Sequence, residues 1–351
     1  APSSLLQVAG DGSTGTWNTN SNSLPVERHE HSSIVANGYV YVMGGCNGLQ
    51  NCAAANSQST IYYAKLNSDG STGTWTTNSN YLPLARLAHS SIVANGYIYV
   101  VGGVAAATTQ STVYYARLNS DGSTGTWTTN SNYLPGLRGW HSSIVANGYI
   151  YVIGGCTGVQ NCGGPSTQST VLYAKLNSDG STGTWTTNTN YLPLERQAHS
   201  SAVANGYVYV IGGATNAVIQ STVFYAKLNS DGSTGTWTTN SNYLPGVRNT
   251  HSSIVANGYI YVIGGCNGGC SSATTQSTVL YAPLARVSIA GNLDLLGIAG
   301  GNLGDSTGDS SFGSVGGSIY AGNIFSAGAL EVSGNSQFWS GAGFSGPVSI
   351  G

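Results

Sequence analysis

The sequence has very little charge. Only 6% of its 351 residues are Asp, Glu, Lys or Arg, and the formal net charge is −2. Nucleic acids and anionic membrane surfaces attract proteins through clustered positive charge, so neither is expected as a partner. The sequence also lacks a run of about 18 apolar residues, which a membrane-spanning helix would require. We therefore expect no membrane insertion, and a surface made of Ser, Thr, Asn and Gly.

Other signals are missing as well. No segment has a sustained helical period, so helix should be nearly absent. No Asn-x-Ser/Thr sequon occurs, which favours a prokaryotic or viral source for a secreted chain. No Gly-rich phosphate loop or zinc motif is present, and the many glycines fit turns. The Ala1-Pro2 start resembles a mature chain from which a signal has been removed.

Cysteines are few and come in close pairs. The three pairs are Cys46 with Cys52, Cys156 with Cys162, and Cys266 with Cys270. Pairs that are present or absent together in one surface loop suggest local disulfides, and hence an oxidising, extracellular compartment. A metal site is the alternative, but two cysteines without a nearby histidine would make an incomplete zinc shell.

What the sequence does contain is a long internal repeat. Anchor histidines occur at His31, His89, His141, His199 and His251. Anchor tryptophans occur at Trp17, Trp75, Trp127, Trp185 and Trp237. Both series advance by 58, 52, 58 and 52 residues. A period of about 40 to 50 residues is typical of solenoids and propellers.

Each repeat predicts four short antiparallel strands. In the copy at 199–245, two apolar runs flank Asn205-Gly206, a dipeptide that favours a tight hairpin turn. The third strand is the β-branched and aromatic run STVFYAKLN, and the turn SDGSTG leads to a fourth strand at Gly235–Trp237. Four such strands make one propeller blade.

The repeat resembles the kelch family. The similarity rests on Gly212-Gly213, a Tyr-rich third strand, Trp237, and the following Leu-Pro, Arg248 and His251. It covers about residues 5–286 and implies an all-β, five-bladed kelch-like β-propeller in residues 1–286. A strand at the N-terminus would complete the last blade and close the ring. Kelch propellers mostly bind proteins or ligands, and a minority belong to enzymes.

Residues 287–351 form a second, Gly-rich region. Glycine recurs every six residues at Gly316, Gly322, Gly328 and Gly334. Such hexads fit a small β-solenoid-like or fibre-like segment, and they resemble the stalk repeats of phage tail fibres and bacterial surface fibres. A flexible linker is the alternative, but Ile324, Phe325, Phe338 and Trp339 make this region rather apolar. About 65 residues bury little core alone, so self-association through 287–351 is expected.

Differences between the repeats predict where a ligand would bind. They collect in the connections VERHEH, LARLAH, GLRGWH, LERQAH and GVRNTH and in the cysteine-bearing loops, which should share one face of the ring. Trp140 is the first candidate, either stacking on a sugar or anchoring a protein, or else packing between blades. Polar candidates around it are Glu27, Glu30, Glu195, Gln197 and Asn249.

The same connections carry one arginine in each repeat. These arginines are Arg28, Arg86, Arg138, Arg196 and Arg248. A ring of guanidinium groups near the central channel could hold a carboxylate or sulfate. Because every blade has one, a structural role bonding the loop carbonyls is favoured. The five anchor histidines make a poor catalytic base for the same reason.

Enzyme families were weighed and set aside. SDGSTGTW resembles the Asp-box of sialidases, but its spacing is one residue too long. A copper site similar to that of galactose oxidase would need a cysteine that is not already paired. We expect no catalytic residues, no metal and no cofactor. The sequence predicts a non-enzymatic structural or adhesive protein, secreted to a cell or virion surface as a filament subunit. The alternative is a monomeric lectin-like module that binds glycan or protein.

Overall fold

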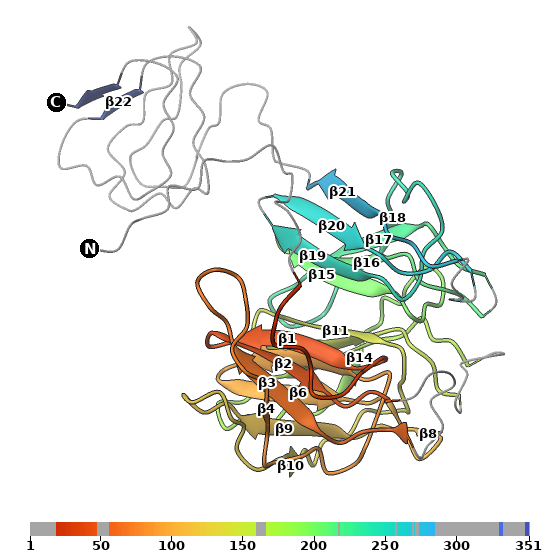
Figure 1. The fold of residues 1–351 in the computed structure, drawn as a ribbon. Helices are drawn as coiled ribbons and strands as arrows, with labels where there is room; N and C mark the ends of the chain where they lie inside the picture. The colour runs from red at the N-terminus through yellow and green to blue at the C-terminus, as the bar shows by residue number, and fades with distance from the viewer. Residues whose placement is uncertain are drawn as a thin grey trace, which may run out of the picture. The chain divides into compact units, whose positions relative to one another are not determined.

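The computed structural model describes residues 19–47, 56–158, 166–216, 218–256, 258–268, 270, 274–284, 330–332 and 348–350. The chain divides into two compact units, Ala1–Leu284 and Ala285–Gly351, which are treated separately here. The described part of the first unit is a five-bladed β-propeller built from antiparallel sheets (Figure 1). No described residue lies in an α-helix.

The blades follow one another in chain order. Blade 1 contains β1 (Ser32–Ala36), β2 (Tyr39–Met43), β3 (Ile61–Lys65) and β4 (Thr76–Thr77). Blade 2 contains β5 (Ser90–Ala94), β6 (Tyr97–Val101), β9 (Val113–Arg117) and β10 (Thr128–Thr129). Blade 3 contains β11 (Ser142–Ala146), β12 (Tyr149–Ile153), β13 (Val171–Lys175) and β14 (Thr186–Thr187).

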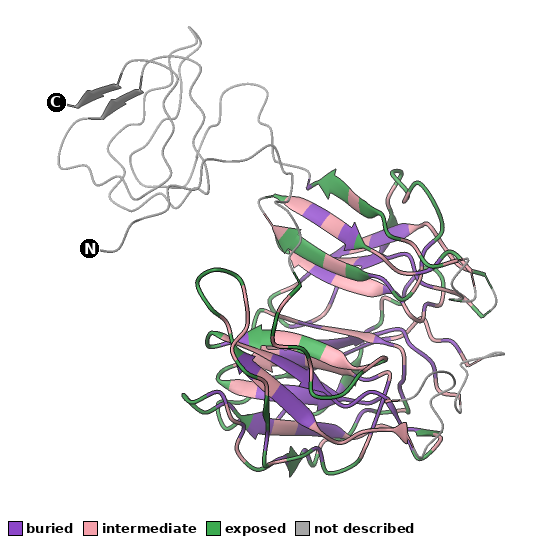
Figure 2. Cartoon of the chain, in the orientation of Figure 1, coloured by how far each residue is buried: buried purple, intermediate pink, exposed green. Residues whose placement is uncertain are grey.

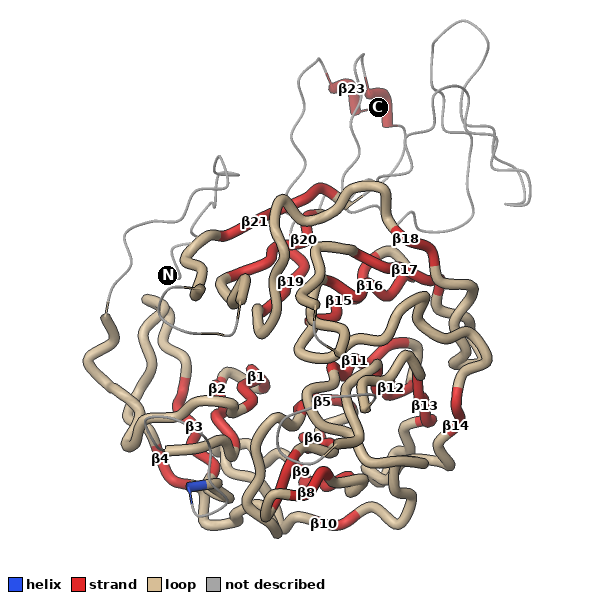
Figure 3. Tube along the Cα trace, turned by 90° about the vertical axis from the view of Figure 1, so that its right-hand side faces the viewer, coloured by secondary structure: helices blue, strands red, loops and turns tan. Residues whose placement is uncertain are grey.

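The remaining strands complete the ring. Blade 4 contains β15 (Ser200–Ala204), β16 (Tyr207–Ile211), β17 (Val223–Lys227) and β18 (Thr238–Thr239). The described strands of blade 5 are β19 (Ser252–Ala256), β20 (Tyr259–Ile263) and β21 (Val279–Pro283). A two-stranded ribbon of β7 (Val104–Ala105) and β8 (Thr108–Thr109) projects from blade 2. The first strand of each blade lies nearest the centre of the ring (Figure 3).

Two-residue turns set the register of each inner hairpin. In blade 2, Ala94 pairs with Tyr97, so Asn95 and Gly96 alone form the turn. Their φ angles are 52° and 78°, which is the left-handed backbone that Asn and Gly tolerate best. The predicted Asn-Gly hairpin is therefore present, and it fixes which side chains of both strands face the neighbouring blades.

The fourth strand begins later than the sequence predicts. Leu228 pairs with Thr234, and Tyr225 pairs with Thr238. Between these two pairs the chain advances by three residues at β17 and by four residues on the outer strand. One extra residue on one strand is a β-bulge, which interrupts the ladder locally. The bulge moves the regular strand from the predicted 235–237 to Thr238–Thr239. Trp237, just before it, is only 7% exposed.

Hydrophobic cores lie between blades rather than within them. One core joins Tyr99, Val101 and Val113 of blade 2 to Val152 and Trp185 of blade 3. Equivalent clusters join blades 1 and 2 and blades 3 and 4. Because each sheet is covered on both faces by its neighbours, its strands read as nearly continuous apolar runs. Figure 2 shows this buried layer in the middle of the blades.

Polar contacts repeat at the same junctions. The Trp185 indole Nε1 donates to the backbone oxygen of Asn132 at 3.1 Å, and Asn130 Nδ2 donates to Thr182 Oγ1 at 2.8 Å. Asn130 is 2% exposed, so this hydrogen bond satisfies an amide that would be costly to bury alone. At the junctions of blades 1 and 2, 2 and 3, and 3 and 4, one tryptophan and one asparagine thus join neighbouring blades.

The segment before blade 1 makes these contacts too. Asn20 Nδ2 donates to Thr72 Oγ1 at 2.6 Å, and the Trp75 indole donates to the backbone oxygen of Asn22 at 3.0 Å. Asn20 and Asn22 therefore contact blade 1 as the end of one blade contacts the next. The predicted closing strand around Trp17 itself lies outside the described residues.

The face of blade 5 on the side away from blade 4 is exposed to solvent. Ile254 is 49% exposed and Val279 is 53% exposed, whereas their counterparts in blade 2, Ile92 and Val113, are 8% and 0% exposed. Strand β21 is correspondingly green along much of its length in Figure 2. This face is the one that blade 1 would cover in a fully closed ring.

Two short strands are described in the second unit. They are β22 (Leu330–Val332) and β23 (Val348–Ile350), paired in parallel with Leu330 opposite Val348. The register offset of 18 residues is three times the six-residue glycine step. Such an offset is typical of one coil in a three-sided parallel β-helix. No described helix is long and apolar enough to cross a membrane.

Candidate functional site

Two sets of variable loops meet on one face of the ring. A residue of each connection that enters a blade forms an antiparallel bridge with the loop that follows the second strand of that blade. These bridges join His29 with Cys46, Leu87 with Val104, Gly139 with Cys156, Gln197 with Ala214, and Asn249 with Cys266. The face where most repeat differences were predicted to collect is thus one continuous surface, here called the loop face.

An inner ring of five residues organises the loop face. Its members are Glu30, Ala88, Trp140, Ala198 and Thr250, and each has a φ angle between 49° and 53°. The backbone N–H of each of the last four members donates to the carbonyl of the member before it, at 3.2, 3.0, 2.8 and 2.8 Å in chain order. These positions share one strained backbone conformation but differ in side chain, so the backbone of the ring is constant while the side chains it presents vary.

A pair of glycines allows the blades to approach this closely. A Cβ on Gly102 would lie 2.4 Å from the carbonyl oxygen of Arg138 in the next blade. A Cβ on Gly103 would lie 2.7 Å from the carbonyl oxygen of Leu87 and from the Cβ of His89. Both glycines also have positive φ angles. Only glycine satisfies both conditions without displacing the loops.

Trp140 is half-buried in the inner ring. Its side chain packs against a small cluster of Cys46, Leu87 and Val104. The two interpretations from the sequence, packing between loops and exposure to a ligand, therefore each describe part of this side chain. The indole is held in place by the cluster and still presents a surface to solvent.

The polar candidates lie on the connections of the loop face. Glu27 and Glu30 are exposed, and Glu195, Gln197 and Asn249 are half-buried. Desolvation by the surrounding loop atoms raises the pKa of the Glu30 carboxyl above its ordinary value, and the nearby His29 lowers it by a smaller amount. Three of the four glutamates in the chain lie on this face. The loop face is thus acidic and carries one accessible indole.

The arginines do not join this surface. Arg86 and Arg196 are fully buried, and Arg138 and Arg248 are 4% and 5% exposed. Arg86 donates to the carbonyl of Gly102 and to Thr112 Oγ1, and its guanidinium lies 4.3 Å from the centre of the Tyr114 ring. Arg28, which is half-buried, lies 5.1 Å from the Tyr62 ring. Burial leaves the arginines little access to a ligand, in line with a structural role.

Four of the five anchor histidines, all except the half-buried His31, are buried at the blade junctions. Ser32 Oγ lies 2.7 Å from His89 Nε2, and Ser90 and Ser142 make the same hydrogen bond with His141 and His199, at 2.8 Å each. Burial lowers the pKa of His89, His141 and His199 to about 3 and that of His251 to about 4. Neutral, equivalent imidazoles without a distinct neighbour fit a structural role.

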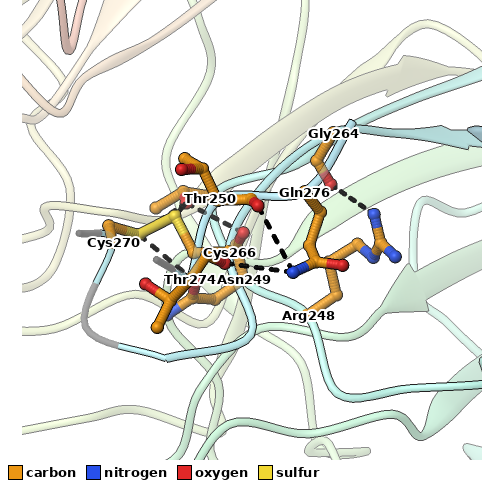
Figure 4. The surroundings of a disulfide bond; sticks show 9 residues. Arg248, Asn249, Thr250, Gly264, Cys266, Cys270, Thr274 and Gln276 are labelled. Carbon is orange, nitrogen blue, oxygen red and sulfur yellow. Dashed lines mark hydrogen bonds between the residues drawn. A yellow bond between two sulfur atoms is a disulfide. The ribbon is translucent and has the colours of Figure 1, made fainter. Parts of the chain in front are cut away.

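One predicted disulfide is described in full. Cys266 and Cys270 are bonded, and the Thr250 hydroxyl lies 3.4 Å from the Cys266 sulfur (Figure 4). The disulfide therefore sits beside Asn249 and the inner ring. Cys46 and Cys156 are also disulfide-bonded, while Cys52 and Cys162 lie outside the described residues. No group of three potential metal ligands occurs among the described residues.

The opposite face of the ring holds a pocket that the sequence analysis overlooked. It lies at the turn end of blade 2 and is lined by Tyr97, Tyr115, Arg117 and Asp179, among others. The repeats ANGY and SDGSTG predict turns there, and a turn explains the glycines. A turn does not explain why a tyrosine, a cation and an aspartate recur together, and this recurrence is the sequence signal that could have predicted the pocket.

Comparison with known proteins agrees with the repeat and the fold. A family model described as "Kelch motif" matches residues 27–63 and 248–277. Kelch domain-containing protein 3 of Rattus norvegicus is 30% identical over 199 residues, which cover 54% of this chain and 48% of that protein. Kelch-like protein 15 of Danio rerio is 26% identical over 206 residues, covering 54% of this chain and 31% of that protein.

A third relative shows the same partial coverage. Spermatocyte protein spe-26 of Caenorhabditis elegans is 28% identical over 165 residues, which cover 46% of this chain and 26% of that protein. The chain thus spans about half the length, or less, of the curated relatives it matches. The repeated sequence, the five blades and these matches together support a kelch-repeat β-propeller.

Proposed function

We propose that this chain is a non-enzymatic, extracellular structural or adhesive protein whose propeller is displayed as part of a surface fibre. The observation that carries the proposal is the distribution of differences between repeats. The blades are nearly identical in their strands and turns, whereas the inner ring holds Glu30, Trp140 and Thr250 where two other blades have alanine. A rigid frame with one diversified face is suited to recognition rather than catalysis.

The chemistry of the loop face favours a protein partner. Trp140 offers an anchored aromatic surface, and Glu27, Glu30 and Glu195 supply carboxylates on the same face. Aromatic anchors dominate the binding energy of protein interfaces, and surface carboxylates steer partners that carry Lys or Arg. Kelch propellers generally mediate protein interactions, which agrees with this choice.

Two further observations support display outside the cell. Structural disulfides such as Cys266–Cys270 mostly form and persist in oxidising compartments. The parallel pairing of Leu330–Val332 with Val348–Ile350 fits a β-solenoid-like segment, whose end strands offer edges for another copy. Self-association through residues 287–351 would join propellers into a filament, and many weak loop-face contacts would then act together.

Erasing the inner-ring differences should strongly weaken adhesion without unfolding the ring. The triple variant Glu30→Ala, Trp140→Ala and Thr250→Ala gives every blade the alanine that Ala88 and Ala198 already hold at φ 51°. We expect at least a tenfold loss of binding to cells, since an interface tryptophan commonly contributes about 2 kcal/mol or more. Flow cytometry with the labelled chain on a panel of bacterial and animal cells measures this.

The controls separate the partner classes. Asp69→Asn changes an exposed turn on the opposite face, where Pro283 replaces the cation of the neighbouring blade, and should leave this adhesion unchanged. Binding that is lost after protease treatment of the cells supports a protein partner, whereas loss after glycosidase treatment supports the lectin-like alternative. A triple variant that adheres as strongly as the wild type, or a wild type that adheres to no cell, contradicts the proposed role of the loop face.

A further inference from the structure

The pocket on the turn face lies at the junction of blades 2 and 3. It has a volume of about 270 Å³ and is lined by Tyr97, Tyr115, Ala116, Arg117, Gly125, Thr126, Thr128 and Asp179. Blade 2 supplies all of these residues except Asp179, which comes from the SDGSTG turn of blade 3. Pockets for drug-sized ligands are commonly about 300 to 1,000 Å³, so this one suits a single small ring.

Two tyrosines form a fixed aromatic wall. The rings of Tyr97 and Tyr115 meet edge to face, with centroids 6.0 Å apart and an interplanar angle of 66°. Tyr97 also packs on Gly180, where an added Cβ would lie 2.5 Å from the ring. Both tyrosines are only partly buried. The wall is therefore preorganised and still accessible, as stacking on a ligand requires.

The pocket also carries one cation and one carboxylate. Arg117 and Asp179 are both exposed at its edge. Asp179 Oδ1 accepts hydrogen bonds from the Ser181 backbone N–H at 2.9 Å and from the Ser181 hydroxyl at 2.7 Å. These bonds orient the carboxylate and leave Oδ2 for a ligand. Arg117 adds several donors, so a polyhydroxylated molecule finds both acceptors and donors here.

The same constellation recurs at the two adjacent junctions. Tyr39 and Tyr63 meet at 6.0 Å and 61°, and Tyr149 and Tyr173 meet at 6.0 Å and 64°. The matching charged residues are Lys65 with Asp121 and Lys175 with Asp231. Asp121 and Asp231 accept from Ser123 and Ser233 with the same geometry as Asp179. Three equivalent arrangements of two tyrosines, a cation and an aspartate, here called the junction grooves, therefore lie on consecutive blades.

Packing alone does not explain the charges in these grooves. The chain has only ten cationic residues, and five of them are the arginines of the loop-face connections. Four of the other five occupy this one position at the end of the third strand: Lys65, Arg117, Lys175 and Lys227. A sequence with 6% charged residues thus places most of its accessible cations beside an aspartate and a tyrosine pair.

We propose that each junction groove binds one sugar residue of an uncharged polysaccharide. The tyrosines contact the apolar face of the sugar ring, the aspartate accepts from its hydroxyls, and the Lys or Arg donates to them. A carboxylate in every groove disfavours anionic ligands such as phosphate or sulfate. Repetition at a fixed spacing matches a ligand that itself repeats, and three weak sites on one chain gain by avidity.

The test removes the carboxylate charges and keeps the turns. The variant Asp121→Asn, Asp179→Asn and Asp231→Asn retains Oδ1 as an acceptor for the serines, so the fold should be unchanged. Affinity electrophoresis of the whole chain in gels containing dextran, mannan or galactan measures binding. We expect the wild type to be retarded by at least one polymer and the triple variant to bind it at least tenfold more weakly. Asp179→Asn alone should lose about threefold.

Matched variants make the result specific to the grooves. Asp69→Asn alters the same turn in blade 1, but the junction before that blade has Pro283 in place of the cation, so retardation should persist. The inner-ring alanine variant should also bind normally, because this inference is independent of the loop face. A triple aspartate variant retarded as much as the wild type, or a wild type that none of the three polymers retards, overturns the proposal.

Discussion

Lowering the pH from 7.5 to 5 is expected to unfold the propeller well before its carboxylates are protonated. His89, His141 and His199 are buried as neutral rings with pKa values of about 3, and His251 has a pKa of about 4. In the unfolded chain each would have a pKa near 6.5. The folded state therefore binds fewer protons than the unfolded state throughout the interval between these values.

The sign and size of the effect follow from that difference. A depressed histidine pKa contributes stability that is fully present above about pH 6.5 and is lost as the pH falls toward the folded value. Each such histidine costs about 1.4 kcal/mol per pH unit in this interval, so four cost roughly 5 kcal/mol per unit. The loss between pH 6.5 and 5 is therefore about 8 kcal/mol, which exceeds the stability of a domain in the lower half of the usual range of about 5–15 kcal/mol.

Urea unfolding at pH 7.5, 6.5, 5.5 and 5.0 measures this dependence. The matched variant His199→Gln keeps a polar side chain that does not titrate, and it should reduce the slope by about a quarter. The aspartates of the SDGSTG turns have pKa values lowered by their serine hydrogen bonds, so they titrate at more acidic pH and do not confuse the result. A stability that stays constant from pH 7.5 to 5.0 would show that the histidines are not buried in the neutral form.

The second large effect is expected at Trp17. In the described blades, Trp127, Trp185 and Trp237 are 8%, 7% and 7% exposed and donate from the indole to an asparagine carbonyl. Residues 11–17 repeat the sequence DGSTGTW, which blade 5 lacks after β21. We predict that they supply its turn and fourth strand. Trp17→Ala should then destabilise the chain by about 3–5 kcal/mol.

Among the described residues, Asn240 of blade 4 lacks the threonine partner that the equivalent asparagines of blades 1, 2 and 3 have. Asn78, Asn130 and Asn188 are 1–2% exposed and bind a threonine of the next blade, whereas Asn240 is half-exposed. Thr14 is the matching threonine. Chemical unfolding of Trp17→Ala beside Trp185→Ala measures the contribution of each tryptophan. Equal losses confirm closure by the N-terminal residues, and a change below about 0.5 kcal/mol at Trp17 alone contradicts it.

The repeat made much of the fold predictable from sequence. Asn-Gly turns and apolar strands of fixed length determine the inner hairpins, because both depend on local backbone preference and on alternation. The position of the fourth strand was less predictable. The bulge before Thr238 depends on how Trp237 packs between two blades, and the local sequence of the strand does not determine that packing.

The site was predictable only where copies differ. Trp140 and Glu30 stand out because other blades have alanine there, and the structure places both in one hydrogen-bonded ring. What could not be predicted is that Trp140 also packs on Leu87 and Val104 from another blade. The junction grooves were overlooked for the opposite reason. They repeat without variation, and their members come together only when two blades are placed side by side.

The proposal that propellers are displayed through a C-terminal assembly segment has one direct test. Native mass is measured by light scattering under non-reducing conditions for the whole chain and for a chain ending at Arg286. Residues 1–284 form their own compact unit, so the shorter chain should remain folded. We expect the whole chain to be oligomeric and the shorter chain to be a monomer. Two monomers would contradict assembly through residues 287–351.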